Sequence, residues 1–228
     1  MQEPIITVII PAFNEEKSIG KVIDAIPKDL VKHVIVVSNT STDNTIEVAK
    51  SAGAIVLEES RKGYGWACLL GIEKSKELNT DIIVFLDGDF SDYPEEIPNV
   101  LAPILENDID MVIGSRVLGK REKGSLTPQQ IFGNWLATKL IRLFYRAKFT
   151  DLGPFRAIKA KELDKLGMAD KTYGWTIEMQ IKAVKKGLKF TEVPVNYKKR
   201  IGISKVSGTV KGTILAGIKI ISAVFKYL

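Results

Sequence analysis

The chain has 228 residues, of which 45% are hydrophobic and 26% charged, and this length and composition suit one α/β domain. Its single cysteine, Cys68, excludes an internal disulfide, and its single histidine, His33, excludes a metal site built from several histidines. The formal net charge of +6 favours an anionic partner, such as a phosphate, a membrane surface or nucleic acid, and chooses none of them.

Apolar segments of strand length alternate with helical patterns along the first half of the chain. We expect strands at residues 5–10, 33–37, 54–58, 81–86 and 110–114. Their apolar residues are consecutive rather than alternating, which is typical of strands covered on both faces in a parallel sheet. The order of elements predicts a doubly wound α/β fold, in which ligands bind beyond the carboxyl ends of the strands.

Three polar segments follow the ends of predicted strands: PAFNEE at 11–16, SNTSTDNT at 38–45 and DGDFSD at 87–92. Because the carboxyl ends of parallel strands share one rim of the sheet, we expect these loops to build a single site. Neither the glycine fingerprint of dinucleotide-binding proteins nor a P-loop follows the first strand. These absences weigh against a NAD enzyme and against a nucleotidyltransferase.

The third polar segment brings like charges together where an apolar strand ends. An acidic, solvated turn is one explanation of this pattern. The other is a divalent cation, Mg²⁺ or Mn²⁺, held by Asp87 and Asp89 with waters and phosphate oxygens completing its coordination. Such a cation would neutralise charge on a leaving nucleotide diphosphate, which is the Lewis-acid role that a glycosyl transfer needs.

Several segments together resemble a known family. They are VIIPAFNEEKSI, VIVVSNTSTDNT, RKGYGWACLLGI, FLDGDFSDYPEEI, DMVIGSR, DLGPFRAIKAKEL, YGWTIEMQIKAVKKG and EVPVNYKKRIGISKVSGT. In order and spacing they are similar to the inverting family-two glycosyltransferases, in the branch of dolichyl- or polyprenyl-phosphate mannose and glucose synthases. The resemblance covers roughly residues 5 to 210. It implies a single GT-A domain at 1–208, with a mostly parallel sheet and helices on both faces, followed by an amphipathic helix at 209–228.

The resemblance also implies roles for particular residues. Asp89 would be catalytic, Asp87 and Asp89 would hold the metal, and the acceptor would contact Ser115 and Arg116. The nucleotide sugar, with either GDP or UDP as its nucleotide, would contact Pro11, Phe13, Asn14, Glu15, Ser38, Asp87, Gly88, Arg200 and Lys205. Outside the resemblance, Glu178 is a second catalytic candidate and Gln130 a further acceptor contact.

The sequence departs from the family pattern in three places. Ser38 stands where the family usually has an acid that reads the base, so the nucleotide stays open. Ser91 stands where the branch often has a glutamine at the metal site, so Asp92 or water would substitute. The segment TPQQIFGN lacks the arginine and serine that usually precede this helix in lipid-phosphate synthases, which leaves Arg116 and distant basic residues to bind an acceptor phosphate.

Two acceptor classes remain open because they make different chemical demands. A phosphate is already anionic at neutral pH and needs cations, whereas a sugar hydroxyl needs a general base. Glu178, on an otherwise apolar helix face, is the candidate base if its pKa is raised there; a salt-bridge partner is the alternative. A third hypothesis is a non-catalytic module that binds a sugar nucleotide or a lipid. No nucleic-acid partner is expected.

Two segments have the pattern of helices at a membrane interface. Residues 129–149 place an apolar face beside a stripe of Trp and basic residues, and the tail at 209–228 repeats this pattern. Ordinary packing against the sheet is the alternative. No segment reaches the roughly 18 uncharged apolar residues of a membrane span, and the start lacks a signal peptide. We therefore expect a cytoplasmic protein, with any attachment to the inner membrane face peripheral. The apolar face is Phe132, Leu136, Leu140, Leu143 and Ala147, and the stripe is Trp135, Lys139, Arg142 and Arg146.

Overall fold

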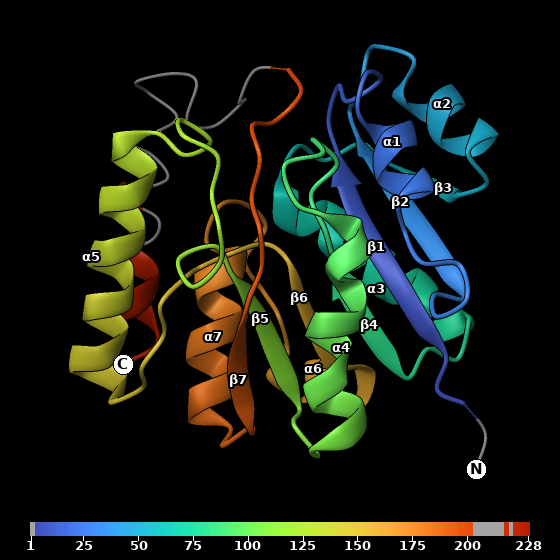
Figure 1. Ribbon diagram of the computed structural model, residues 1–228. Helices are drawn as coiled ribbons and strands as arrows, with labels where there is room; N and C mark the ends of the chain where they lie inside the picture. The colour runs from blue at the N-terminus through green and yellow to red at the C-terminus, as the bar shows by residue number, and fades with distance from the viewer. Residues whose placement is uncertain (1–2, 203–216, 219–220) are drawn as a thin grey trace.

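The computed structural model describes residues 3–202, 217–218 and 221–228. A seven-stranded sheet crosses this part of the chain, in the strand order β3-β2-β1-β4-β6-β5-β7 (Figure 1). The strands are β1 Ile6–Ala12, β2 His33–Asn39, β3 Ile55–Glu59, β4 Ile82–Phe85, β5 Met111–Ser115, β6 Arg156–Lys159 and β7 Phe190–Pro194. The helices are α1 Ile19–Asp24, α2 Thr45–Ser51, α3 Tyr64–Glu77, the short 3₁₀ helix η1 Pro94–Glu96, α4 Ile97–Glu106, α5 Pro128–Tyr145, α6 Ala160–Leu166 and α7 Trp175–Lys185.

The sheet is mostly parallel, as the consecutive apolar residues predicted. β1 pairs in parallel with β2 and β4, β2 with β3, and β5 with β7. All five predicted strands are present. The structure adds β6, which runs antiparallel between β4 and β5, and β7 at the edge. These two strands have only four and five residues, too few to show a clear period in the sequence.

Helices cover both faces of the sheet, because alternate residues of each strand point to opposite sides. On one face Val8, Val84 and Val112 pack with α1, α2 and α4. On the other face, Ile9 and Phe85 pack with α3, α5, α6 and α7. The strands are therefore buried from both sides, and polar groups concentrate where the strands end.

Helix α5 is less buried than the other long helices. Thr127 and Gln130 form a capping box at its start, and only Ala137, Thr138 and Ile141 of its residues are buried. Residues 221–226 form a helical segment that lies against α5 near the end of the chain (Figure 1). This segment, residues 221–228, is called the C-terminal segment below. Residues 209–216 and 219–220 of the predicted C-terminal helix lie outside the described residues.

Candidate active site

A cavity of about 260 Å³ opens at the carboxyl ends of β1, β2 and β4, where the polar loops were expected to meet. Its walls come from the loops after these three strands, from the start of α3 and from two distant segments around residues 173 and 200. Those distant segments converge on the cavity because β6, β7 and α7 return the chain to the same rim. The lining residues are Pro11, Ala12, Phe13, Glu15, Asn39, Lys62, Gly63, Tyr64, Asp87, Gly88, Asp89, Tyr173 and Arg200.

The loops at this rim have strained backbones. Asn14, Thr40 and Phe90 have positive φ angles of 54°, 61° and 60°, which residues other than glycine rarely adopt. Each follows one of the three strands whose ends form the cavity. Asn14 offsets this cost by joining two loops: its side-chain oxygen accepts from the Thr42 N–H at 2.8 Å, and its backbone N–H donates to Ser41 Oγ at 3.1 Å. Strain of this kind is typical of functional sites.

Two aspartates and an arginine meet at one end of the cavity. Arg200 forms ion pairs with Asp89 at 3.1 Å and with Glu15 at 3.2 Å. Asp89 also accepts hydrogen bonds from the backbone N–H and the hydroxyl of Ser91. Asp87 accepts from the Tyr64 hydroxyl at 3.2 Å. Four segments far apart in the sequence therefore set the charge of this end.

The like charges of the pair raise one pKa. Burial, followed by the negative charge of Asp89, raises the pKa of Asp87 to about 7, although Arg200 opposes the shift. Asp92 is buried deeper: neither of its carboxylate oxygens has a hydrogen-bond partner, and burial raises its pKa well above the usual range. A cation near these acids would relieve the repulsion that raises both pKa values.

An aromatic ring and a lysine also line the cavity. Phe13 lies on its wall, and the Lys62 ammonium lies 5.0 Å from the centre of the Phe13 ring. Asn39 donates to the backbone oxygens of Glu59 and Arg61 and accepts from the Gly63 N–H at 2.8 Å. The amide of Asn39 thereby shapes the loop before α3, which contributes Lys62 and Gly63 to the wall.

The structure separates the predicted donor residues into lining and supporting positions. Pro11, Phe13, Glu15, Asp87, Gly88, Asp89 and Arg200 all line the cavity. Ser38 is 2% exposed within β2 and does not line it, and its neighbour Asn39 does. Asn14 supports the loops from outside the cavity. Lys205 lies outside the described residues.

Six lining residues were not among the site residues predicted from the sequence: Ala12, Asn39, Lys62, Gly63, Tyr64 and Tyr173. Gly63 forms the turn that precedes α3, with a φ angle of 151°. The same residue also faces the cavity, so the turn and the site share one position. Asn39 was within reach of sequence reasoning, because it adjoins Ser38 at the strand end.

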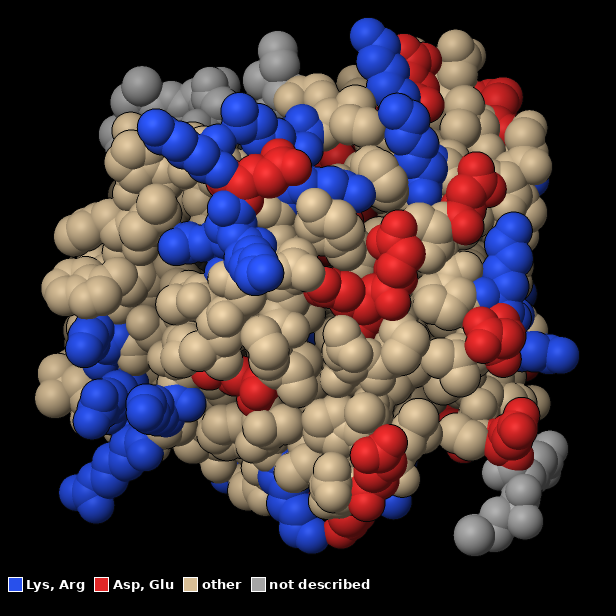
Figure 2. Space-filling view, viewed as in Figure 1, with Lys and Arg blue, Asp and Glu red and all other residues tan. Residues whose placement is uncertain are grey.

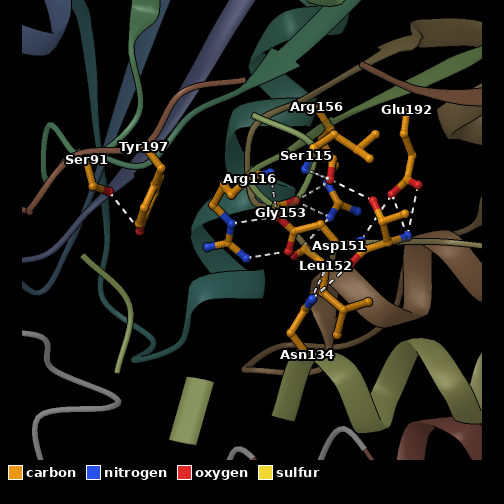
Figure 3. A network of polar contacts seen from close by, with 12 residues as sticks. Ser91, Ser115, Arg116, Asn134, Asp151, Leu152, Gly153, Arg156, Glu192 and Tyr197 are labelled. Atoms are coloured by element: carbon orange, nitrogen blue, oxygen red, sulfur yellow. Dashed lines mark hydrogen bonds and ion pairs between the residues drawn. The ribbon is translucent and has the colours of Figure 1, made fainter. Parts of the chain in front are cut away.

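A buried polar network lies beside the cavity on the side predicted to bind the acceptor (Figure 3). Arg116 makes a two-pronged ion pair with Asp151, and its own backbone N–H also donates to that carboxylate. Asn134 on α5 ties in the same loop by donating to the Thr150 oxygen and accepting from the Leu152 N–H. The position of Arg116 therefore depends on α5 and on the loop at 150–153.

The other two predicted acceptor residues make local structural contacts. Ser115 shares a hydrogen bond of 2.6 Å with Thr150 inside the network. The Gln130 side chain accepts from the Thr127 N–H at 2.8 Å and so completes the cap of α5. Neither residue lines the cavity. Their contact with an acceptor stays a prediction.

Glu178 does not have the raised pKa that a general base in an apolar setting was expected to show. The carboxylate is fully buried, and burial alone would raise its pKa. Hydrogen bonds from Lys182, Tyr227 and the Asp170 N–H outweigh that effect and lower the pKa instead. Glu178 is also absent from the cavity wall, so its contacts are those of a salt-bridged structural acid.

With this geometry described, comparison with known proteins identifies the family. The model of the family described as glycosyl transferase family 2 matches residues 7–167. The chain belongs to glycosyl transferase family 2. An uncharacterised glycosyltransferase of Mycobacterium tuberculosis is 33% identical over 214 residues, covering 92% of this chain and 94% of that protein. The family-2 resemblance predicted from the motifs is confirmed, and the protein is a glycosyltransferase.

Two further proteins are similar to this chain. The undecaprenyl-phosphate mannosyltransferase of Micrococcus luteus is 28% identical, over 92% of this chain and 90% of its own length. The solved glucosyl-3-phosphoglycerate synthase of Mycobacterium tuberculosis, in complex with Mn²⁺, UDP and glucosyl-3-phosphoglycerate, has a TM-score of 0.79 at 23% identity. That match covers 98% of this chain and 80% of the other. The GT-A fold is confirmed.

Within residues 3–202, 217–218 and 221–228, no helix is both long and apolar enough to cross a membrane.

Proposed function

We propose that this family-2 enzyme transfers a hexose from a nucleotide-diphosphate sugar, with UDP or GDP as its nucleotide, to polyprenyl phosphate at a membrane surface. The observation that carries the donor half is the meeting of Asp87, Asp89 and Arg200 in a cavity that Phe13 and Lys62 also line. Carboxylates that can share a cation, next to an arginine, suit a diphosphate. An aromatic ring beside a lysine suits a base.

The residues at the acidic end fit a divalent cation, Mg²⁺ or Mn²⁺. Burial and the like charge of Asp89 raise the pKa of Asp87, and a divalent cation would offset both effects. Among the described residues, no group of three or more His, Cys, Asp or Glu side chains is placed to hold a metal ion. Two carboxylates would therefore share the metal with diphosphate oxygens and water, and the bound metal would supply Lewis-acid stabilisation of the leaving nucleotide. The solved structure of similar fold, which holds Mn²⁺ and UDP, supports this assignment.

The side chains of this chain would orient the donor. The Arg200 guanidinium forms ion pairs with both Asp89 and Glu15. A diphosphate bound here would replace a carboxylate as the ion-pair partner of Arg200. Ser91 keeps Asp89 in place through two hydrogen bonds. Tyr64 donates to Asp87 and fixes the second carboxylate. Together these contacts preorganise the acidic end before the donor binds.

The choice of a phosphate as the proposed acceptor depends on whether Glu178 can act as a general base. With its pKa lowered and its oxygens occupied, Glu178 is a poor general base. An ionised phosphate acceptor needs none, because it attacks without giving up a proton. Arg116, which already binds a carboxylate with two N–H groups, has the geometry for a phosphate as well. The similarity to the undecaprenyl-phosphate mannosyltransferase supports the same acceptor class.

The surface of α5 supports a membrane location for that acceptor. The rings of Phe132 and Trp135 lie 5.8 Å apart at a tilt of 32°, with 60% and 52% of the two residues exposed, and Leu143 is 70% exposed. On the C-terminal segment, Ile221 and Phe225 are exposed as well. Lys and Arg gather over the lower end of α5 in the space-filling view (Figure 2). Apolar residues with basic neighbours are typical of helices at a lipid interface. We call this surface the α5 face: Phe132, Trp135, Lys139, Arg142, Leu143, Arg146, Ile221 and Phe225.

A charge-reversal experiment tests this function. The triple variant Lys139→Glu, Arg142→Glu and Arg146→Glu should lose binding to anionic vesicles and transfer to polyprenyl phosphate, because each basic residue near such a surface contributes about 1 kcal/mol. Both losses should shrink as salt rises. The measurements are vesicle co-sedimentation and nucleotide release from UDP- and GDP-sugars with Mn²⁺.

The matched control carries the same change of charge on the far end of the sheet. Lys28, Lys32 and Lys50 are exposed there, and their reversal to Glu should leave both readouts near wild type. Equal losses in both triple variants would contradict the α5 face as a membrane surface.

The second candidate is transfer to a soluble or glycan hydroxyl with Glu178 as the base. The solved synthase that contains glucosyl-3-phosphoglycerate matches the fold over 98% of this chain, and this likeness supports a soluble acceptor. In that case Glu178→Gln should lower the rate about 10²- to 10⁴-fold, the usual range for a general base. The lipid-phosphate proposal expects a smaller loss, which acts through structure alone. A large rate defect in a protein that ignores vesicles would favour the hydroxyl acceptor.

A further inference from the structure

Glu178 joins two segments that are far apart in the sequence. Its oxygens accept hydrogen bonds from the backbone N–H groups of Ala169 at 2.9 Å and Asp170 at 2.7 Å. The Oε1 atom that accepts from Ala169 also pairs with Lys182 at 2.7 Å and accepts from the Tyr227 hydroxyl at 2.7 Å. The first two contacts fix the loop at 167–174, and the last reaches the C-terminal segment. A fully buried carboxylate with this many donors is rigidly placed.

The loop at 167–174 packs directly on the donor cavity. The Lys171 carbonyl oxygen accepts from the Trp66 N–H at 3.3 Å, and the Lys171 ammonium lies 4.3 Å from the centre of the Trp66 ring. A Cβ added at Gly65 would lie 2.1 Å from the Asp170 oxygen, so the loop and the start of α3 are as close as backbones allow. Tyr173, two residues after Lys171, forms part of the cavity wall. A shift of this loop would therefore move Tyr173.

The C-terminal segment is attached at several points besides Tyr227. The Tyr145 hydroxyl donates to the Val224 oxygen, and the rings of Phe144 and Phe225 meet edge to face at 5.3 Å. These contacts dock the segment on α5. Only the Tyr227 hydroxyl, among the contacts described for this segment, reaches the acid that holds the loop.

We propose that Glu178 is a positioning residue that links the docked C-terminal segment to the donor cavity: with Tyr227 bound to it, Glu178 fixes the loop at 167–174 and so holds Tyr173 against the donor. This inference rests on the proposed donor site, because Tyr173 acts there. It gives the buried acid a role without proton transfer, and it makes the C-terminal segment part of the donor site although that segment lies outside the cavity wall.

The test removes one hydroxyl. Tyr227→Phe should weaken binding of UDP or GDP by about 3- to 10-fold, because the loop loses part of the free energy that one charge-assisted hydrogen bond contributes to its position. Calorimetry with Mn²⁺ measures this binding. Hydrogen exchange of the Ala169 and Asp170 amides, measured without nucleotide, should quicken in the same variant. A stabilising role alone would lower the melting temperature without changing exchange at these two amides selectively.

Tyr145→Phe is the matched control, because it removes another hydroxyl bound to the same segment and not to Glu178. It should leave nucleotide affinity and exchange at 169 and 170 near wild type. Unchanged exchange in Tyr227→Phe, or equal effects of both variants, would overturn the inference, as would faster exchange with unaltered affinity. If the wild-type protein binds neither nucleotide, the proposed function fails, and exchange still decides whether Tyr227 and Glu178 hold the loop.

Discussion

At the scale of single residues, the candidate site is a cluster of acids that Arg200 neutralises only in part. Arg200 bridges Glu15 and Asp89, and the hydroxyl and N–H of Ser91 hold Asp89. Ser91 was noted in the sequence only as a departure from a glutamine at the metal site. In the structure its hydroxyl is shared between Asp89 and Tyr197, so it orients the carboxylate rather than replacing a ligand.

Asp89→Ala should abolish transfer while the fold stays intact, because one candidate metal ligand is lost from a rim loop whose core strand is unchanged. The measurement is nucleotide release with Mn²⁺, beside circular dichroism of the purified variant. Asp24→Ala, an exposed acid at the end of α1, is the control and should keep full activity. Full activity of a folded Asp89→Ala protein in the presence of EDTA would exclude a metal role for this residue.

The raised pKa of Asp87 predicts how stability depends on pH. Its pKa is about 7 in the folded chain against an ordinary 3.8, so between these values the folded state binds more protons than the unfolded state. This contribution to stability is fully present below about pH 4 and is lost as pH rises through 7. Chemical denaturation in EDTA should therefore show the metal-free protein losing stability from pH 5 to 8. Asp87→Asn should flatten the slope, and an unchanged slope would contradict the assignment.

At the scale of elements, the start of α3 and the loop at 167–174 form one wall of the cavity. Two glycines make this possible: a Cβ at Gly63 would lie 2.2 Å from the Lys171 oxygen, and one at Gly65 would lie 2.1 Å from the Asp170 oxygen. Gly63 also forms the turn at which α3 begins. Close approach of a second backbone is the stronger reason for glycine at both positions.

Gly65→Ala should push the loop away from α3 and thereby reduce both stability and nucleotide affinity, because backbone atoms cannot move aside as a flexible side chain would. The expected loss of stability is about 1–3 kcal/mol, the usual range for overpacking. Gly133→Ala on α5 is the control, since a Cβ there meets nothing within 4 Å. Denaturant titration and calorimetry with UDP or GDP provide the measurements. Wild-type affinity in the Gly65→Ala protein would show that the loop does not shape the cavity.

At the scale of the whole molecule, one sheet carries two large cores, one on each face. Leu101 on α4 is buried in one core, and Ile141 on α5 is buried in the other. Because β1, β4 and β5 contribute side chains to both cores, loss of one core should unfold the whole chain. The polar network of Arg116 and Asp151 spans β5 and the segment before β6, so it depends on the same sheet.

Leu101→Ala and Ile141→Ala should each lower the free energy of unfolding by about 2–5 kcal/mol, the usual cost of a large-to-small change in a core. Each variant should still unfold in a single transition, followed by tryptophan fluorescence and far-UV circular dichroism in urea. Leu105→Ala, at an exposed position on α4, should cost much less. Two separated transitions in either core variant would show that the halves fold independently.

The sequence by itself determined the first five strands, the mostly parallel sheet, the family and the rim loops that meet at the cavity. Each of these rests on local information: consecutive apolar residues, polar residues at strand ends, and motifs of a few adjacent positions. For the same reason it located Pro11, Phe13, Glu15, Asp87, Gly88, Asp89 and Arg200, which all line the cavity.

Only the tertiary structure decided what depends on distant partners. Glu178 looked like an unpaired acid on an apolar face, and its pKa is lowered because Tyr227 and the N–H groups of a separate loop converge on it. Tyr173 lines the cavity only because its loop packs on α3. The charge state of an acid depends on the hydrogen-bond donors around it. When the fold brings those donors from distant parts of the chain, the residues next to the acid in sequence do not predict them.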